Sequence, residues 1–153
     1  MIRTLRRAGM VAALCLIAST TAGTVSASPQ ADSVQTFRNL ATGGCLDHND
    51  NDGVRDYPCN GGPWQKWEVH RWGDNTRQLK NVATGKCLYY NVLGGDTIRA
   101  GACNASTLSS WYIQYPRVGG IAFQNQSERA CLTSDRYIHL SSCNTDARSQ
   151  SWS

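Results

Sequence analysis

The side chains most often used in catalysis are few and scattered along this 153-residue chain. Three histidines, His48, His70 and His139, are isolated, and neither Gly-x-Ser-x-Gly nor His-Glu-x-x-His occurs. Glu68 and Glu128 could supply paired carboxylates for glycoside hydrolysis, but they resemble ordinary strand and turn residues. The sequence therefore predicts a protein that is not an enzyme and that needs no cofactor.

One acidic run could bind a metal ion. Residues 47–53 read Asp-His-Asn-Asp-Asn-Asp-Gly and resemble a calcium loop. Counting from Asp47, however, places Asp52 where the loop needs glycine and Pro58 where it needs a bidentate glutamate. The run is interpreted as a long polar turn, and no metal site is predicted.

The first 27 residues have the three parts of a secretory signal. Arg3, Arg6 and Arg7 form a basic start, residues 10–18 are apolar, and Val25-Ser26-Ala27 suits cleavage before Ser28. The apolar run is shorter than the roughly 20 residues of a spanning helix. We therefore expect a secreted protein with a single domain over residues 28–153.

The overall charge does not indicate a polyanionic partner. The formal net charge is +4, and three of the basic residues, Arg3, Arg6 and Arg7, belong to the predicted signal. The remaining domain is close to neutral, which favours neither nucleic acid nor an anionic membrane as partner.

Six of the seven cysteines lie beyond the predicted signal: Cys45, Cys59, Cys87, Cys103, Cys131 and Cys143. An even number of cysteines in an exported chain indicates disulfides. Zinc is the alternative, but it requires closely spaced cysteine pairs or neighbouring histidines, which are absent from this sequence.

The cysteines belong to a threefold repeat. Residues 39–46 read Asn-Leu-Ala-Thr-Gly-Gly-Cys-Leu, residues 81–88 read Asn-Val-Ala-Thr-Gly-Lys-Cys-Leu, and residues 125–132 are a diverged third copy. Each copy continues with a Cys-Asn pair and ends on a tryptophan: Trp67, Trp111 and Trp152. The simplest pairing closes a loop within each copy: Cys45–Cys59, Cys87–Cys103 and Cys131–Cys143.

The local sequence predicts strands and turns. Residues 67–70 and 111–115 alternate in polarity as half-buried strands do, and turn-forming clusters such as residues 41–44 and 60–63 separate such segments. A threefold-repeated all-β domain must close on itself to protect its strand edges.

The Cys-Leu-Asp start at residues 45–47, the paired cysteines and the Gln-x-Trp endings resemble the ricin-B-type lectins over the whole of residues 28–153. The resemblance implies an all-β β-trefoil with one potential sugar pocket per repeat. The repeats would span about residues 34–76, 77–117 and 118–153. Residues 57–67 are most similar to bacterial mannose-binding lectins of the actinohivin type.

Carried over from that family, the sugar pocket of the first repeat consists of Asp47, Tyr57, Asn60, Trp64 and Gln65. A carboxylate accepts hydrogen bonds from vicinal hydroxyls, Asn both donates and accepts, and an aromatic ring covers the C–H face of a sugar. Plant toxin lectins usually have Asn where Trp64 stands, which weighs against galactose. In Gln-x-Trp, the tryptophan is expected in the core, and Gln65 or Gln150 is expected to hold a loop.

The other two repeats depart from this pattern. Tyr89 and Thr133 stand in the Asp position, and Gly101 and Ser141 stand in the aromatic position. We therefore expect one competent site, in a monomeric carbohydrate-binding protein whose partner is a glycan or polysaccharide. The alternative is a trefoil with decayed sugar sites that binds a protein, for example as a protease inhibitor.

Overall fold

The computed structural model describes residues 32–95, 97–135 and 137–153, so the predicted signal, residues 1–27, lies outside the described part. Short strands and 3-10 turns alternate along the chain, in the order β1 Ser33–Gln35, β2 Cys45–Asn49, β3 Gly53–Tyr57, η1 Pro63–Gln65, β4 Trp67–Arg71, β5 Arg77–Asn81, β6 Cys87–Asn91, η2 Val92–Gly94, β7 Thr97–Gly101, η3 Thr107–Ser109, β8 Trp111–Gln114, β9 Ala122–Asn125, β10 Cys131–Ser134, β11 Ile138–Ser141 and η4 Arg148–Gln150. Within these residues, no helix is long and apolar enough to cross a membrane.

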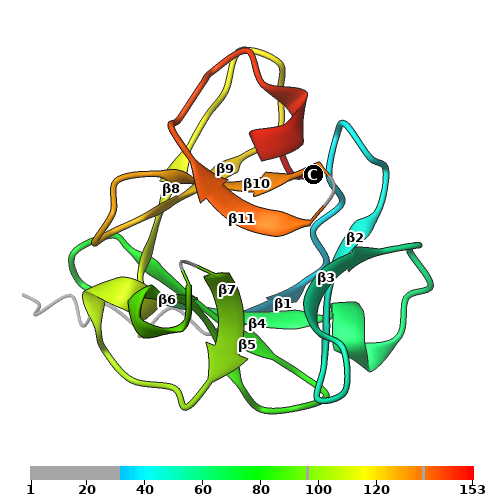
Figure 1. Cartoon of the computed structure of the whole chain (residues 1–153), viewed down its shortest axis with the longest axis vertical. Helices are drawn as coiled ribbons and strands as arrows, with labels where there is room; N and C mark the ends of the chain where they lie inside the picture. Colours follow the sequence, from blue (N-terminus) through cyan, green and yellow to red (C-terminus); the bar gives the residue numbers. More distant parts are fainter. Residues whose placement is uncertain (1–31, 96, 136) are drawn as a thin grey trace, which may run out of the picture.

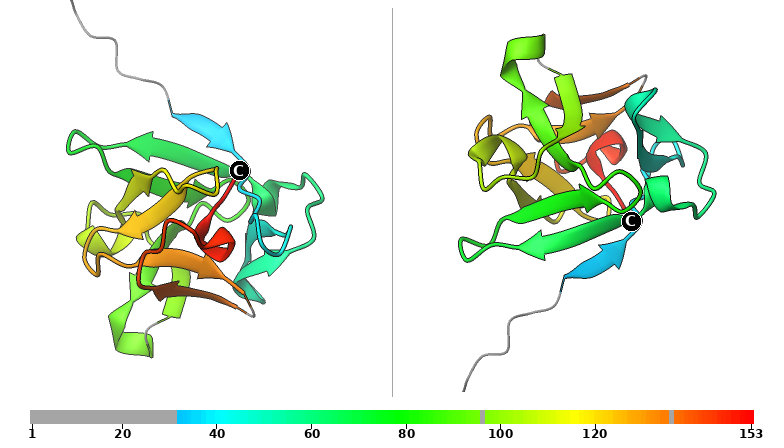
Figure 2. Two further views of the ribbon diagram at one scale, coloured as in Figure 1. Left: turned by 90° about the horizontal axis from the view of Figure 1, so that it is seen from above. Right: turned by 90° about the horizontal axis from the view of Figure 1, so that it is seen from below.

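Three antiparallel hairpins, β2–β3, β6–β7 and β10–β11, each begin at the first cysteine of a repeat. They lie around a common centre, where β3, β7 and β11 contact one another (Figure 1). The β6–β7 hairpin and its turn η2 project from the body of the molecule (Figure 2). The repeat in the sequence is therefore a repeat of hairpins in space.

The other strands form the barrel beneath the hairpins. Strand β4 pairs with β1 and β5, and β8 pairs with β5 and β9. The remaining gap is closed by Trp152, which bridges Asn39 on one side and Ile121 on the other. This closure pairs edges that would otherwise be free, and it confirms the predicted closed all-β fold.

The three tryptophans that end the repeats belong to the hydrophobic core. Trp67, Trp111 and Trp152 are all 0% exposed. Each indole Nε1 donates a hydrogen bond to the carbonyl of the leucine after the first cysteine of its repeat, at 2.9, 3.3 and 3.3 Å. The indoles thus bury a large apolar area and still satisfy their one donor, as predicted for core residues.

A buried asparagine at the start of each repeat fixes the turn that follows. The side-chain oxygens of Asn39, Asn81 and Asn125 accept backbone N–H groups two and three residues later. Their amide nitrogens donate to carbonyls of a neighbouring repeat: Ser149, Trp64 and Leu108 respectively. The asparagines therefore join the repeats as well as shaping them.

The predicted disulfides are confirmed. Cys45–Cys59, Cys87–Cys103 and Cys131–Cys143 have S–S distances of 1.98, 2.05 and 1.97 Å. Loops of this length each stabilise the fold by roughly 3 kcal/mol when unfolded-chain entropy dominates. Each disulfide closes the base of one hairpin, so the hairpins project from anchored ends.

The third repeat keeps its turn without the glycine that the other two use. Gly43 and Gly85 have φ of 75° and 68°, and Arg129 holds the same place with φ of 58°. An L-residue in this left-handed region costs roughly 1–2 kcal/mol. The backbone conformation of this turn is therefore the same in all three repeats, although the third repeat has a different residue at this position.

Candidate functional site

The register of the first hairpin brings the candidate residues onto one face. In the β2–β3 ladder, Asp47 lies opposite Arg55, and Cys45 lies opposite Tyr57. Because side chains alternate along a strand, residues 47, 55 and 57 project to the same side. Trp64 approaches this side from η1, which begins at Pro63.

These side chains line a cavity of about 640 Å³, here called the first-repeat cavity. Its wall consists of Asp47, Asn49, Asp50, Asn51, Arg55, Tyr57, Asn60, Trp64, Ala83 and Thr84. Tyr57 and Trp64 are large aromatics, yet they are 40% and 48% exposed. Exposed aromatic surface beside several polar groups is what a ligand with both apolar and hydroxyl faces requires.

Asp47 is the most deeply placed polar group of the cavity. It lies in β2 at 2% exposure, and its Oδ1 accepts a hydrogen bond from Arg55 Nε at 2.9 Å. Arg55 also contacts Asp52, and its guanidinium carbon lies 4.1 Å above the centre of the Tyr57 ring. A buried carboxylate needs such a partner, because an unpaired buried charge is costly.

Asn60 and Gln65 have different roles. Asn60 is exposed on the cavity wall, and its Oδ1 accepts the backbone N–H of Gly62 at 2.8 Å. Gln65 is 0% exposed; its Oε1 accepts the N–H of Asn60 at 2.8 Å, and its Nε2 donates to the Pro58 carbonyl at 3.0 Å. Gln65 therefore has no exposed surface for the sugar contact predicted for it, and it takes the loop-holding role that was also predicted for it. Gln65 holds the loop that presents Asn60.

The acidic run forms the turn of the hairpin. The Asn49 side-chain oxygen accepts the N–H groups of Asn51 and Asp52 at 2.9 and 2.8 Å. Asp50 contacts Lys86 Nζ at 2.8 Å, and this hydrogen bond holds the pKa of Asp50 below its usual value. Among the described residues, no group of three His, Cys, Asp or Glu side chains could hold a metal ion.

His48 lies on the opposite face of the same hairpin. It is buried, and its Nδ1 lies 2.9 Å from the Thr84 hydroxyl. Burial lowers the pKa of His48 from 6.5, with a smaller contribution from nearby Lys86. This histidine therefore favours its neutral form and packs against the second repeat, away from the cavity.

The corresponding positions in the other hairpins are filled differently. In the second, the Tyr89 ring lies close above Gly101, where an added Cβ would come within 3.0 Å of it. In the third, the Thr133 hydroxyl lies 2.7 Å from that of Ser141, which also accepts a bond from Gln150. Neither hairpin has a carboxylate at this place.

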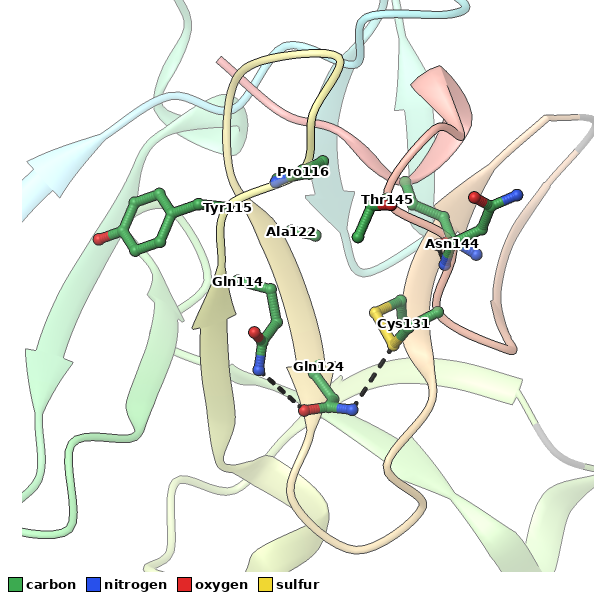
Figure 3. Close-up of a pocket in the computed structure, with 10 residues that line it drawn as sticks. Gln114, Tyr115, Pro116, Ala122, Gln124, Cys131, Asn144 and Thr145 are labelled. Atoms are coloured by element: carbon green, nitrogen blue, oxygen red, sulfur yellow. Dashed lines mark hydrogen bonds between the residues drawn. A yellow bond between two sulfur atoms is a disulfide. The ribbon is translucent and has the colours of Figure 1, made fainter.

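A smaller cavity of about 200 Å³ lies beside the third repeat. It is bordered by the Cys131–Cys143 disulfide, Ala122, Pro116 and Gln124 (Figure 3). The Tyr115 ring and the Asn144 amide point away from it in this view. The first-repeat cavity combines aromatic rings, an amide and charged groups, and it is the better candidate for a binding site.

A family model described as the ricin-type beta-trefoil lectin domain matches residues 33–152. The chain belongs to this family. No match is found among curated protein sequences. The family supports carbohydrate binding as the general activity of this lectin domain, and the all-β fold with its three disulfides agrees with a β-trefoil.

Solved structures share the fold at low sequence identity. A designed threefold-symmetric protein, ThreeFoil, has a TM-score of 0.69 at 18% identity, covering 78% of this chain and 95% of that one. An agglutinin from Rhizoctonia solani has a TM-score of 0.67 at 19% identity, covering 83% and 96%. A GlcNAcα1-4Gal-releasing endo-β-galactosidase from Clostridium perfringens has a TM-score of 0.69 at 20% identity, covering 78% of this chain. This chain spans only 31% of that galactosidase.

The sequence pattern missed part of the cavity wall. Arg55 could have been found, because Asp47 and Arg55 are equally far from the turn centred at Asn51 and must therefore pair across a regular hairpin. Ala83 and Thr84 come from the second repeat. No local pattern places that loop beside the first hairpin.

Proposed function

We propose that this protein is a secreted lectin that binds glycans or polysaccharide through the first-repeat cavity. The observation that carries the proposal is the combination, at one place, of Asp47, Asn60, Tyr57 and Trp64 around an open cavity. Family membership supplies the general activity, and the cavity supplies a location for it.

The chemistry of the cavity suits a sugar ring. Tyr57 and Trp64 offer exposed aromatic surface that can cover the C–H face of a pyranose. The Asn60 amide nitrogen can donate to a hydroxyl, because the side-chain oxygen is the atom that already binds Gly62. The Asp47–Arg55 pair adds a charged acceptor and charged donors.

The proposal is restricted to one site per chain. In the second hairpin the Tyr89 ring lies over Gly101, and in the third the hydroxyls of Thr133 and Ser141 contact each other. A single shallow pocket supplies about 4–6 kcal/mol, which corresponds to millimolar to sub-millimolar affinity. A monomer with one site lacks the avidity needed to cross-link glycoproteins, so we propose a lectin that does not agglutinate cells.

Binding without catalysis is part of the proposal. The carboxylates nearest the cavity, Asp47, Asp50 and Asp52, are all engaged by Arg55 or Lys86. A glycosidase needs one carboxyl group that donates a proton and a second that attacks or activates water. Each of these carboxylates is instead held by a basic side chain of the protein, which supports a role in recognition.

A glycan array probed with the secreted domain tests the proposal. We expect binding to a subset of glycans, loss of that binding in Asp47→Ala, and retention in Thr133→Ala, which alters the matching position of the third repeat. Circular dichroism of both variants would verify folding. If the wild-type protein binds no glycan on the array, the proposal is contradicted and a protein partner is favoured.

A further inference from the structure

We propose that Arg55 is the residue through which the first-repeat cavity contacts its glycan directly, that Asp47 acts as a positioning residue for Arg55, and that the ligand is a neutral sugar. This inference rests on the proposed function, because it concerns the same cavity. It changes the expected role of Asp47 from a direct acceptor of sugar hydroxyls to a support.

Exposure distinguishes the two members of the pair. The Asp47 side chain is 2% exposed, whereas that of Arg55 is 30% exposed. Asp47 Oδ1 already accepts the Arg55 Nε–H at 2.9 Å. A sugar that enters the cavity therefore meets the guanidinium before it can reach the carboxylate.

The guanidinium is held on three sides. Nε donates to Asp47, Nη1 donates to Asp52, and the planar group lies 4.1 Å above the Tyr57 ring. Within residues 32–95, 97–135 and 137–153, Nη2 has no hydrogen-bond partner. A planar group fixed in this way presents its free N–H donors in a constant direction, which reduces the entropy lost on binding.

The second hairpin provides an internal comparison. Arg99 has the register position of Arg55, but it lies opposite Tyr89 instead of a carboxylate. Its Nε donates to the Thr97 hydroxyl at 3.2 Å. An arginine at this register position therefore does not by itself form an ion pair with the opposite strand. The ion pair to the opposite strand depends on Asp47, because Tyr89 holds that register position in the second hairpin.

The charge around Arg55 selects against acidic ligands. Two carboxylates, Asp47 and Asp52, face one guanidinium, while Asp50 is balanced by Lys86. The cavity therefore carries a net negative charge and would repel a uronate or sialate carboxylate. Free N–H donors in a negative cavity fit hydroxyl and ring oxygens of a neutral sugar.

A double-mutant cycle tests the assignment. Affinities of wild type, Arg55→Met, Asp47→Ala and the double variant are measured by calorimetry with mannotriose, galactotriose, xylotriose and trigalacturonate. We expect Arg55→Met to weaken binding of the neutral sugar about tenfold or more, and the double variant to bind as Arg55→Met does. If Asp47→Ala weakens binding by the same factor in the Arg55→Met variant as in the wild type, then Asp47 contacts the sugar itself and the inference is overturned.

Conservative variants separate positioning from folding. Asp47→Asn keeps an oxygen acceptor for Arg55 Nε, so we expect most of the affinity to be retained, whereas Arg55→Lys loses the planar fork and is expected to bind weakly. Arg99→Met is the matched control and should bind as wild type does. Preference for trigalacturonate, or unchanged binding by Arg55→Met, would overturn the inference and leave the proposed function intact. Absence of wild-type binding to all four probes and to the array would contradict both.

Discussion

The first and third hairpins use the same three positions in opposite ways. In β2–β3, Asp47, Arg55 and Tyr57 are long or charged side chains that border a cavity of about 640 Å³. In β10–β11, the same positions hold Thr133, His139 and Ser141, and the hydroxyls of Thr133 and Ser141 lie 2.7 Å apart. The backbone ladders match in register around the cysteine that begins each hairpin. A site is therefore gained or lost through a few outward-facing side chains.

Both hairpins keep the same leucine on the inward side, directly after the first cysteine. Leu46 and Leu132 are 0% exposed, and their carbonyls accept the indole N–H of Trp67 and Trp152 respectively. Binding chemistry and folding chemistry thus occupy opposite faces of the same strands. This separation predicts which substitutions change stability in both repeats and which change binding in one.

The largest expected effect concerns the shared inward face. Trp67→Ala and Trp152→Ala should each lower the free energy of unfolding by about 3–5 kcal/mol, because each removes a fully buried indole. Trp64→Ala, at a 48% exposed position, serves as the control and should change stability far less. Urea denaturation measures all three, and a mild effect of Trp152→Ala would show that the third repeat is not equivalent to the first.

The second prediction converts the outward face of the first hairpin into that of the third. The triple variant Asp47→Thr, Arg55→His, Tyr57→Ser should lose detectable glycan binding, because the cavity loses its charged pair and one aromatic wall. The double variant Thr133→Ala, Ser141→Ala in the third hairpin should bind as the wild type does. Persistent binding by the triple variant would place the site elsewhere.

Most of the fold follows from the sequence because the repeat is a covalent pattern. Paired cysteines, a phased tryptophan and an asparagine six residues before each first cysteine constrain three equivalent hairpins, and the all-β fold and its disulfides follow. The indole of Trp152 and the loop-holding role of Gln150 were predictable for the same reason, since each repeats a feature of the first copy.

The candidate site was less predictable, because its details depend on pairing across strands and between repeats. Asp47 was expected to bind sugar directly, yet its position opposite Arg55 buries it in an ion pair. Gln65 was predicted both to line the sugar pocket and to hold a loop, and only its hydrogen bonds decide for the loop. Thr84 reaches the cavity only because the second repeat packs against the first.

A third prediction uses pH. The pKa of buried His48 is below 6.5 in the folded protein, so the unfolded chain takes up a proton first as the pH falls. Stability from this group is therefore present above pH 6.5 and is lost as the pH falls from 6.5 toward the folded pKa. Ser134 has the equivalent position in the third hairpin, so His48→Ser is a replacement that the fold already accepts there. This variant should flatten this part of the stability profile measured by thermal unfolding. An unchanged slope would show that His48 is not the titrating group.

The smallest expected effect concerns the turn before each hairpin. Gly85→Ala should destabilise by about 1–2 kcal/mol through its φ of 68°, since nothing lies within 4 Å of the added Cβ. Arg129→Gly should stabilise by a smaller amount, because removing Arg129 also removes its contact 5.0 Å above the Tyr112 ring. Chemical denaturation measures both, and a loss of stability in Arg129→Gly would show that this ring contact outweighs the backbone strain.

The buried asparagines have a consequence for how such a molecule could arise. Asn39 donates to the third repeat, Asn81 to the first, and Asn125 to the second, so the dependence runs in a ring with no terminal unit. Linear repeat arrays can lengthen one unit at a time, because each unit contacts only its neighbours. Here, one or two units would leave buried amide groups without partners. A single repeat of this kind would form these bonds only as a cyclic homotrimer.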